Sequence, residues 1–152
     1  EDSSALYERF GGNMSRAMGL DIGTKTIGIA FSDPTYLIAQ AHSTLKRTQL
    51  SQDLAAVERL IQEQDVREIV IGLPKHMNNQ LSDSARRAQS FGAELRKKGY
   101  SIEYQDERLS TKSASQVLMK TGVRRENRKK HVDAVAATFI LQQWLDRRSK
   151  QQ

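Results

Sequence analysis

The stretch Met18-Gly-Leu-Asp-Ile-Gly-Thr-Lys-Thr-Ile-Gly-Ile-Ala-Phe-Ser-Asp33 has the pattern of two β-strands joined by a short turn. Apolar residues alternate with small or polar ones on both sides of Gly23-Thr-Lys25, and this period of two predicts half-buried strands. One residue breaks the pattern: Asp21 places a carboxylate within the first strand, where Asp is among the least favourable residues. A buried carboxylate needs a partner or a metal ion, so Asp21 is a candidate functional residue. The alternative is that the strand ends early and Asp21 begins a turn.

The rest of the chain predicts a mixed α/β fold. A third strand over about residues 37–45 follows the turn at Asp33-Pro34, and helical and strand patterns then alternate. Three antiparallel strands followed by helical crossovers predict one mixed five-stranded sheet with helices on both faces. The later predicted elements are a helix over 50–64 with an apolar stripe from Leu50 to Ile61, a strand over 68–73, a helix over 83–98 capped by Ser82 and ended by Gly99, a strand over 101–105, and helices over about 111–122 and 130–147.

A single domain accounts for nearly all of the 152 residues, which suffice to bury roughly two thirds of the surface of the unfolded chain. Residues 1–17 have no clear apolar period, and we expect them to be an added or disordered leader, with the natural start near Met14 or Met18. Residues 18–148 then form the domain, and 149–152 are a short tail.

The composition predicts a soluble cytoplasmic protein without disulfides. The chain contains no cysteine and shows no secretory leader. Its longest apolar runs, such as Ile69-Val-Ile-Gly-Leu73, are far shorter than the roughly 20 residues that span a bilayer. We therefore expect no membrane association.

A net charge of +6 and a pI of about 9.7 favour nucleic acid as the partner. The cluster Arg96-Lys97-Lys98 is explained equally well by a solvated helix face. A second cluster lies in a predicted loop and is the better candidate for nucleic-acid contact. It consists of Arg124, Arg125, Arg128, Lys129 and Lys130.

Two further carboxylates accompany Asp21. Asp106 and Glu107 directly follow the predicted strand over 101–105, and carboxyl ends of strands line the ligand crevice of an open α/β sheet. If the strand continues, Glu107 shares a face with Glu103 and Gln105, and Asp106 lies on the other face. Asp133 lies near the start of the last helix, on the flank of its apolar stripe, and is expected to face the sheet. Either position could instead serve only the dipole of a helix.

Three carboxylates gathered on one sheet repel one another unless a cation is bound. Oxygen ligands without cysteine favour Mg²⁺ or Mn²⁺ over Zn²⁺. Two such ions about 4 Å apart can activate water and stabilise the attacking and leaving oxygens of a phosphodiester. The sequence thus predicts metal-dependent hydrolysis of nucleic acid.

Four motifs follow one another along the chain. They are Asp21-Ile-Gly23-Thr-Lys25-Thr-Ile-Gly28, Gly72-Leu-Pro74-Lys-His-Met77-Asn78, Asp106-Glu-Arg-Leu-Ser110 and Arg128-Lys-Lys-His-Val-Asp133-Ala-Val-Ala-Ala137. In this order they resemble the YqgF (RuvX) family of ribonuclease H-like proteins, over about residues 18–146. Four ordered motifs are far more specific than any one of them.

The resemblance implies a ribonuclease H-like fold and a bacterial cytoplasmic protein. It implies maturation of the 5′ end of small-subunit (pre-16S) ribosomal RNA or, from likeness to RuvC, resolution of Holliday junctions. By motif position, Asp21, Glu107 and Asp133 become the expected metal-binding catalytic residues. Lys25 and Arg108 become expected phosphate contacts.

Three functions remain open from the sequence. The preferred prediction is a metal-dependent nuclease that acts on structured RNA. The second is a resolvase of four-way DNA junctions, which usually needs two active sites related by a dimer axis. The third is a nucleic-acid-binding module without turnover, which would contact its ligand through residues 124–130 and bind without Asp21. The sequence allows either a monomer or a homodimer.

Overall fold

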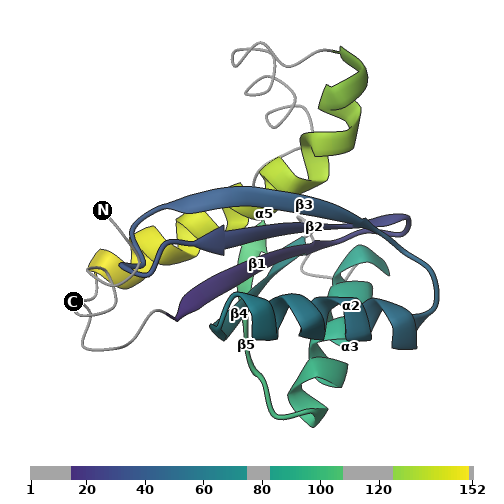
Figure 1. Ribbon diagram of the computed structural model, residues 1–152, viewed down its shortest axis with the longest axis horizontal. Helices are drawn as coiled ribbons and strands as arrows, with labels where there is room; N and C mark the ends of the chain where they lie inside the picture. The colour runs from purple at the N-terminus through teal and green to yellow at the C-terminus, as the bar shows by residue number, and fades with distance from the viewer. Residues whose placement is uncertain (1–14, 75–82, 108–124, 151–152) are drawn as a thin grey trace.

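Five strands form one sheet in the order β3-β2-β1-β4-β5 (Figure 1). The computed structural model describes residues 15–74, 83–107 and 125–150, with the backbone alone for 107, 125–133 and 150. β1, β2 and β3 form an antiparallel meander, and β4 and β5 continue the sheet in parallel with β1. This arrangement confirms the predicted mixed sheet. The strands are β1 (Arg16–Ile22), β2 (Thr26–Ser32), β3 (Ala39–Lys46), β4 (Val66–Pro74) and β5 (Ser101–Glu107).

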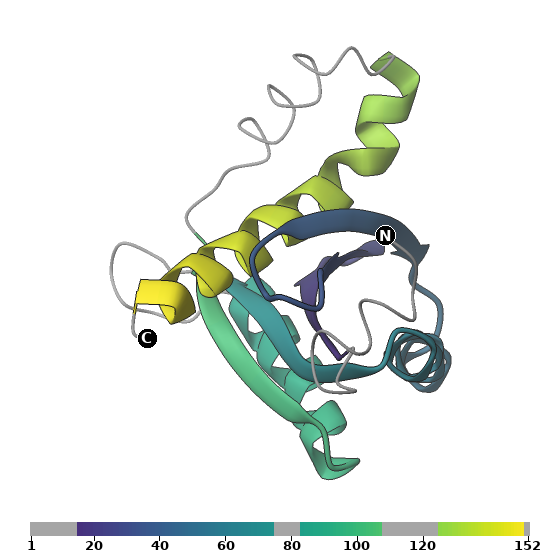
Figure 2. The same cartoon turned by 60° about the vertical axis from the view of Figure 1, so that its left-hand side comes forward.

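Helices cover both faces of the sheet. α2 (Leu50–Glu63) and α3 (Asp83–Lys97) lie on one face, and α5 (Arg125–Lys150) crosses the other (Figures 1 and 2). α3 ends as the sequence predicts, because Gly99 has a positive φ of 99° and the N–H of Tyr100 donates to the carbonyl of Leu95 at 3.2 Å. In the part of the chain that the structure describes, no helix is long and apolar enough to cross a membrane.

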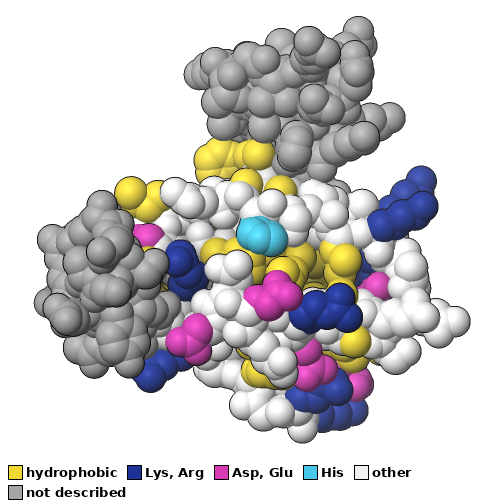
Figure 3. All heavy atoms as spheres, in the orientation of Figure 1, with side chains coloured by type: hydrophobic (Ala, Val, Ile, Leu, Met, Phe, Trp, Pro, Cys, Tyr) yellow, Lys and Arg dark blue, Asp and Glu magenta, His cyan; other side chains and the backbone are white. Residues whose placement is uncertain are grey.

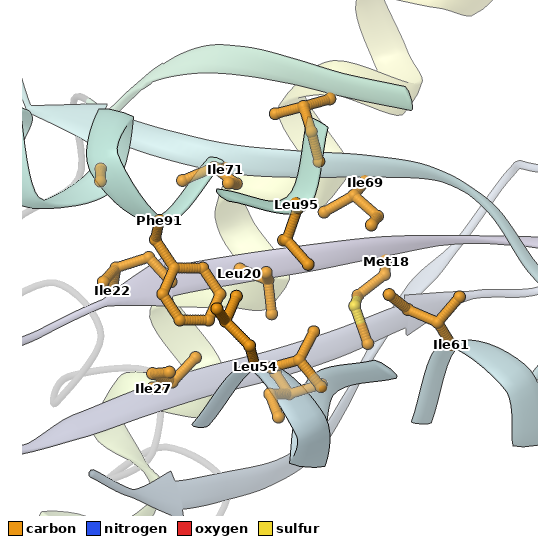
Figure 4. Close-up of a cluster of buried hydrophobic side chains, with 14 of the residues drawn as sticks. Met18, Leu20, Ile22, Ile27, Leu54, Ile61, Ile69, Ile71, Phe91 and Leu95 are labelled. Atoms are coloured by element: carbon orange, nitrogen blue, oxygen red, sulfur yellow. The ribbon is translucent and has the colours of Figure 1, made fainter. Parts of the chain in front are cut away.

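The alternation along β1 decides which side chains enter which core. Met18, Leu20 and Ile22 point toward α2 and α3 and pack with Phe91 and other apolar side chains (Figure 4). The alternate residues of the strand point toward α5, and among them Ala17 joins a second, smaller core. Strand β1 is therefore buried on both faces, as a central strand of a mixed sheet requires.

α5 lies directly on β1 at Gly19. A Cβ atom at this position would stand 2.8 Å from the Cβ atom of Leu141 and 2.9 Å from the carbonyl oxygen of Ala137. No side chain larger than hydrogen fits without moving the helix. The C-terminal turns of α5 contact the amino end of β4, since Arg148 pairs with Glu68 near the start of that strand. The earlier turns consequently lie toward the carboxyl ends of β1 and β4.

The structure corrects the predicted start of the last helix. Arg125 to Lys130, predicted to form a basic loop, are the first turns of α5 and extend beyond the sheet (Figure 1). The segment contains no Gly or Pro, and Glu126 precedes Lys130 by four residues, a spacing that favours helix. The high charge of this segment was mistaken for a loop signal.

Two smaller differences concern the limits of elements. β1 begins at Arg16 and Ala17 is fully buried, so the fold starts inside the segment that we expected to be a leader. Leu50 is 46% exposed and does not belong to the buried stripe of α2, which consists of Leu54, Val57 and Ile61. The predicted helix over 111–122, the cap at Ser82 and most of the Pro74–Leu81 loop lie outside the described residues.

Candidate active site

Asp21 lies within β1 and does not begin a turn. It is half-buried and shares the α5 face of the strand with Gly19. Its antiparallel neighbour on β2 is Gly28. On the other side Leu20 pairs with Ile71, so one further step along the register brings Gly72 of β4 level with Asp21. The carboxylate therefore stands between two strand positions that carry no side chain, which leaves open space beside it.

The structure places Glu107 as the last residue of β5, paired with Pro74. The face of this residue follows from its neighbours on the strand. Glu103 accepts a hydrogen bond from Nε1 of Trp144 on α5 at 2.8 Å, and Gln105 accepts one from Arg147 on α5 at 3.1 Å. Alternation puts residue 107 on this same face. Asp106 belongs to the opposite face, as expected.

Asp133 lies in α5, one helical turn before Ala137 and two before Leu141, the residues that contact Gly19. These three positions share one side of the helix. Since earlier turns of α5 lie toward the carboxyl end of β1, position 133 falls at the end of the sheet where Asp21 stands. The side chains of Glu107 and Asp133 are outside the described residues, and among the side chains that are described no group of three acidic or histidine residues could hold a metal ion.

The predicted phosphate contacts are placed only in part. Lys25 is exposed in the turn between β1 and β2, four residues after Asp21. The first turns of α5 contain residues 125, 128, 129 and 130, of which the structure describes only the backbone. Arg108 and Arg124 are also outside it. On the face shown in Figure 3, described basic and acidic side chains are interspersed, so the net positive charge is not concentrated there.

Two adjoining cavities lie at the other end of α5, with volumes of about 320 and 260 Å³. They share Glu68 and Arg148, which form an ion pair at 2.9 Å. The guanidinium of Arg148 lies 5.0 Å from the ring centre of Tyr36 and 5.3 Å from that of Trp144. Burial and the neighbouring Glu68 carboxylate raise the pKa of Tyr36 to about 12. This cluster fastens the C-terminal turns of α5 to the sheet at the amino end of β4, and the second cavity extends along β5 as far as Gln105.

The loop beside the larger cavity is held by Asp33. Its carboxylate accepts hydrogen bonds from the backbone N–H groups of Leu37 and Ile38, each at 2.9 Å, and from Thr35. Burial acts to raise the pKa of Asp33, but these hydrogen bonds outweigh it and the pKa lies below its ordinary value. Asp33 is therefore a structural carboxylate of a turn, unlike Asp21.

Sequence reasoning did not single out Gly28 and Gly72 as neighbours of Asp21. Both occur in the quoted motifs, but only the strand register shows that they flank the same carboxylate. It also missed Arg47 and Asp53, an ion pair that contacts the turn after β1. Nothing in the local pattern of charges distinguishes these two residues from surface side chains.

The strand order, the helices on both faces and the acidic residue on the central strand define a ribonuclease H-like fold. Two solved structures share it. RuvC of T. thermophilus in complex with a Holliday junction substrate has a TM-score of 0.56 and 15% identity, and the match covers 89% of this chain and 96% of that one. The Fowlpox virus resolvase with Holliday junction DNA has a TM-score of 0.57 and 10% identity, and the match covers 87% of this chain and 97% of that one. A phage G20c terminase nuclease with bound zinc is similar at a TM-score of 0.51, with 13% identity over 85% of this chain and 80% of that one.

The chain belongs to the RuvX family, described as Holliday junction resolvase, which it matches over residues 15–147. Its sequence is 44% identical over 133 residues to a protein of Moorella thermoacetica, covering 87% of this chain and 95% of that one. It is 46% identical over 132 residues to a protein of Syntrophomonas wolfei, covering 86% and 94%. Both relatives carry the name "Putative pre-16S rRNA nuclease". The family resemblance predicted from the four motifs is confirmed.

Proposed function

We propose that this chain is a metal-dependent nuclease of the bacterial cytoplasm that hydrolyses phosphodiester bonds at the 5′ end of pre-16S rRNA. The observation that carries the proposal is the placement of Asp21, a half-buried carboxylate between Gly28 and Gly72 at the carboxyl end of the central strands. The names of the relatives supply the substrate, and the fold shared with nucleases agrees with the reaction.

We assign the metal-binding and catalytic roles to Asp21, Glu107 and Asp133. The donor set fits a hard divalent cation such as Mg²⁺ or Mn²⁺, because all three groups are carboxylates and Gly72 keeps the strand between β1 and β5 free of a side chain at the level of Asp21. Strands β1 and β5, on either side of β4, are two strand spacings, about 10 Å, apart. When bound, two such ions would lower the pKa of a water molecule and neutralise charge on the phosphate.

The chain's own residues bind and orient the nucleic acid. Lys25 extends into solvent from the turn next to Asp21, where its ammonium group can contact a phosphate oxygen. The first turns of α5 bring Arg125, Arg128, Lys129 and Lys130 to the same end of the fold. We also assign phosphate contacts to Arg108, which follows Glu107 in the sequence, and to Arg124. A phosphodiester held by these cations lies over the carboxylates in the orientation that hydrolysis requires.

The test is cleavage of two substrates by the same preparation with Mg²⁺ or Mn²⁺ added. One substrate is a pre-16S rRNA fragment that carries the 5′ extension, and the other is a four-way DNA junction of matched length. We expect trimming of the RNA extension, and no cleavage of either substrate in excess EDTA. Faster cleavage of the junction than of the RNA would reject the rRNA assignment and favour the second candidate function.

That second candidate, resolution of Holliday junctions, is favoured by two of the comparisons. The family description names it, and the structurally similar RuvC and Fowlpox virus resolvase are both solved with a junction substrate. A resolvase has to cut two strands symmetrically, so a dimer of this chain in solution would support this function. Specific binding of RNA without any cleavage would instead indicate the third candidate, a non-catalytic nucleic-acid-binding module.

Replacing Lys25 with Ala is expected to weaken RNA binding about five- to tenfold at low salt, because one phosphate contact is lost. The slope of log Kd against log salt concentration should fall by about one unit, since one fewer cation is displaced. Titration of a labelled RNA in EDTA at four salt concentrations measures both quantities. An unchanged slope would show that Lys25 does not contact phosphate.

A further inference from the structure

We propose that Arg47, held by the buried carboxylate of Asp53, is a positioning residue that fixes the turn of residues 23–25 and thereby presents Lys25 to the nucleic acid. This inference rests on the proposed function for the identity of the ligand. The positioning pair itself, Arg47 and Asp53, lies outside the four motifs and the candidate site.

Asp53 and Arg47 form an ion pair inside the fold. The carboxylate of Asp53, in the first turn of α2, is 2% exposed, and the Arg47 side chain is 17% exposed. Nε of Arg47 donates to Oδ2 of Asp53 at 3.2 Å. The other oxygen, Oδ1, accepts from the backbone N–H of Thr48 at 3.0 Å and from its hydroxyl at 3.3 Å. The carboxylate thus fixes both the guanidinium and the backbone that follows it.

The same guanidinium reaches the turn after β1. Nη1 of Arg47 donates to the carbonyl oxygen of Gly23 at 2.9 Å, and the backbone N–H of Arg47 donates to the carbonyl oxygen of Lys25 at 2.8 Å. Within the turn, the N–H of Gly23 donates to the carbonyl of Thr26 at 2.8 Å. Arg47 therefore holds the turn at both of its ends, two and four residues after Asp21.

This arrangement depends on the shape of the arginine side chain. The guanidinium donates to a carboxylate through Nε and to a carbonyl through Nη1, in two fixed directions. Its central carbon also lies 5.8 Å from the ring centre of Phe91 on α3. A lysine keeps the charge but has a single ammonium group, which cannot reproduce the fork geometry of these contacts.

A structural role alone accounts poorly for this pair. Two charges removed from water contribute little net stability, and apolar residues of similar size often stabilise a fold as well or better. The pair instead specifies one position for the turn, in which Lys25 is exposed and Gly23 is held. A cation on a fixed backbone loses less conformational entropy when it binds phosphate than one on a mobile loop.

The test is a double-mutant cycle on RNA binding, measured in EDTA so that no cleavage occurs. The proteins are the full chain, Lys25→Ala, Arg47→Lys and the double variant, with the 5′ pre-16S rRNA fragment as the ligand. Lys25→Ala is expected to weaken binding about five- to tenfold when Arg47 is present and less than about twofold in the Arg47→Lys background. Equal losses in the two backgrounds would overturn the proposal.

Arg148→Lys is the matched control. Arg148 also pairs with a carboxylate, the partly buried one of Glu68. It lies in the last turns of α5, far from the turn of residues 23–25. The same substitution there should leave the full effect of Lys25→Ala in place. Asp53→Asn removes the charge of the partner and should reproduce the effect of Arg47→Lys. Loss of the Lys25→Ala effect in the Arg148→Lys background would mean that any weakened ion pair has this result, and would reject positioning by Arg47.

A second measurement needs no nucleic acid. The N–H of Gly23 is hydrogen-bonded within the turn, so its hydrogen exchange should accelerate in Arg47→Lys and stay unchanged in Arg148→Lys. Unchanged exchange at Gly23 in both variants overturns the proposal even if the chain binds RNA. If the chain binds no RNA but hydrogen exchange at Gly23 accelerates in Arg47→Lys alone, the proposed function is refuted. That result would still support the inference that Arg47 fixes the turn.

Discussion

Asp21→Asn is expected to lower the rate of RNA cleavage by at least about 10³-fold, which corresponds to roughly 4 kcal/mol of transition-state stabilisation. The amide keeps the size of the side chain but removes the negative charge that a divalent cation requires. Asp21 is on the central strand β1, between Gly28 of β2 and Gly72 of β4. No neighbouring side chain of β2 or β4 at that level can therefore replace it. Single-turnover cleavage of the pre-16S rRNA fragment at saturating Mg²⁺ measures the effect.

Asp83→Asn provides the control for Asp21→Asn. Asp83 is a 93% exposed carboxylate at the start of α3, so the same chemical change there should leave the cleavage rate within a factor of two. RNA binding in EDTA should be retained by both variants, because neither removes a positively charged side chain. Equal cleavage by Asp21→Asn and the unmodified chain would indicate a contaminating nuclease and reject the proposed site.

Gly19→Ala is expected to affect both stability and cleavage. The new methyl group would stand 2.8 Å from Cβ of Leu141 and 2.9 Å from the carbonyl oxygen of Ala137, and neither atom is the end of a flexible side chain. We expect a loss of about 1–3 kcal/mol in the free energy of unfolding, since α5 must shift away from β1. That shift moves Asp133 relative to Asp21, so cleavage should fall by about 10- to 100-fold. Urea denaturation and single-turnover rates separate the two effects.

Gly92→Ala is the comparison for Gly19→Ala. A Cβ atom at Gly92 would overlap the hydroxyl of Tyr104, so this substitution also crowds a contact between a helix and the sheet. The crowding occurs at α3, on the face opposite α5. Gly92→Ala should therefore be destabilised but cleave RNA at nearly the normal rate when folded. Similar losses of cleavage in the two variants would show that α5 placement is not what limits the reaction.

Local patterns in the sequence predicted a large part of the fold. The alternation through Met18, Leu20 and Ile22 identified the buried face of β1, because side chains of a strand point to opposite faces in turn. Gly99 predicted the end of α3, since few other residues adopt a positive φ. The prediction was wrong where charge was used in place of propensity, at the start of α5.

The candidate carboxylates were also found in the sequence. Asp21 was found because an acidic residue in an apolar strand is unusual wherever the strand lies, and Glu107 and Asp133 were assigned from their positions in the family motifs. Their roles remain a prediction, and the structure adds the positions of the backbone. Residue 107 shares the α5 face with Asp21, and residue 133 lies in the helix that packs on Gly19. Both placements follow from the topology of the sheet and the direction of α5.

The sequence by itself determined the period of each strand and helix and the identity of the acidic residues, since these depend on neighbours along the chain. Only the tertiary structure decided that Gly28 and Gly72 flank Asp21 and that Arg47 joins Asp53 to the carbonyl of Gly23. Strand register and buried ion pairs join residues that are distant in sequence, and their energies depend on the packing of the whole domain. No local pattern encodes them.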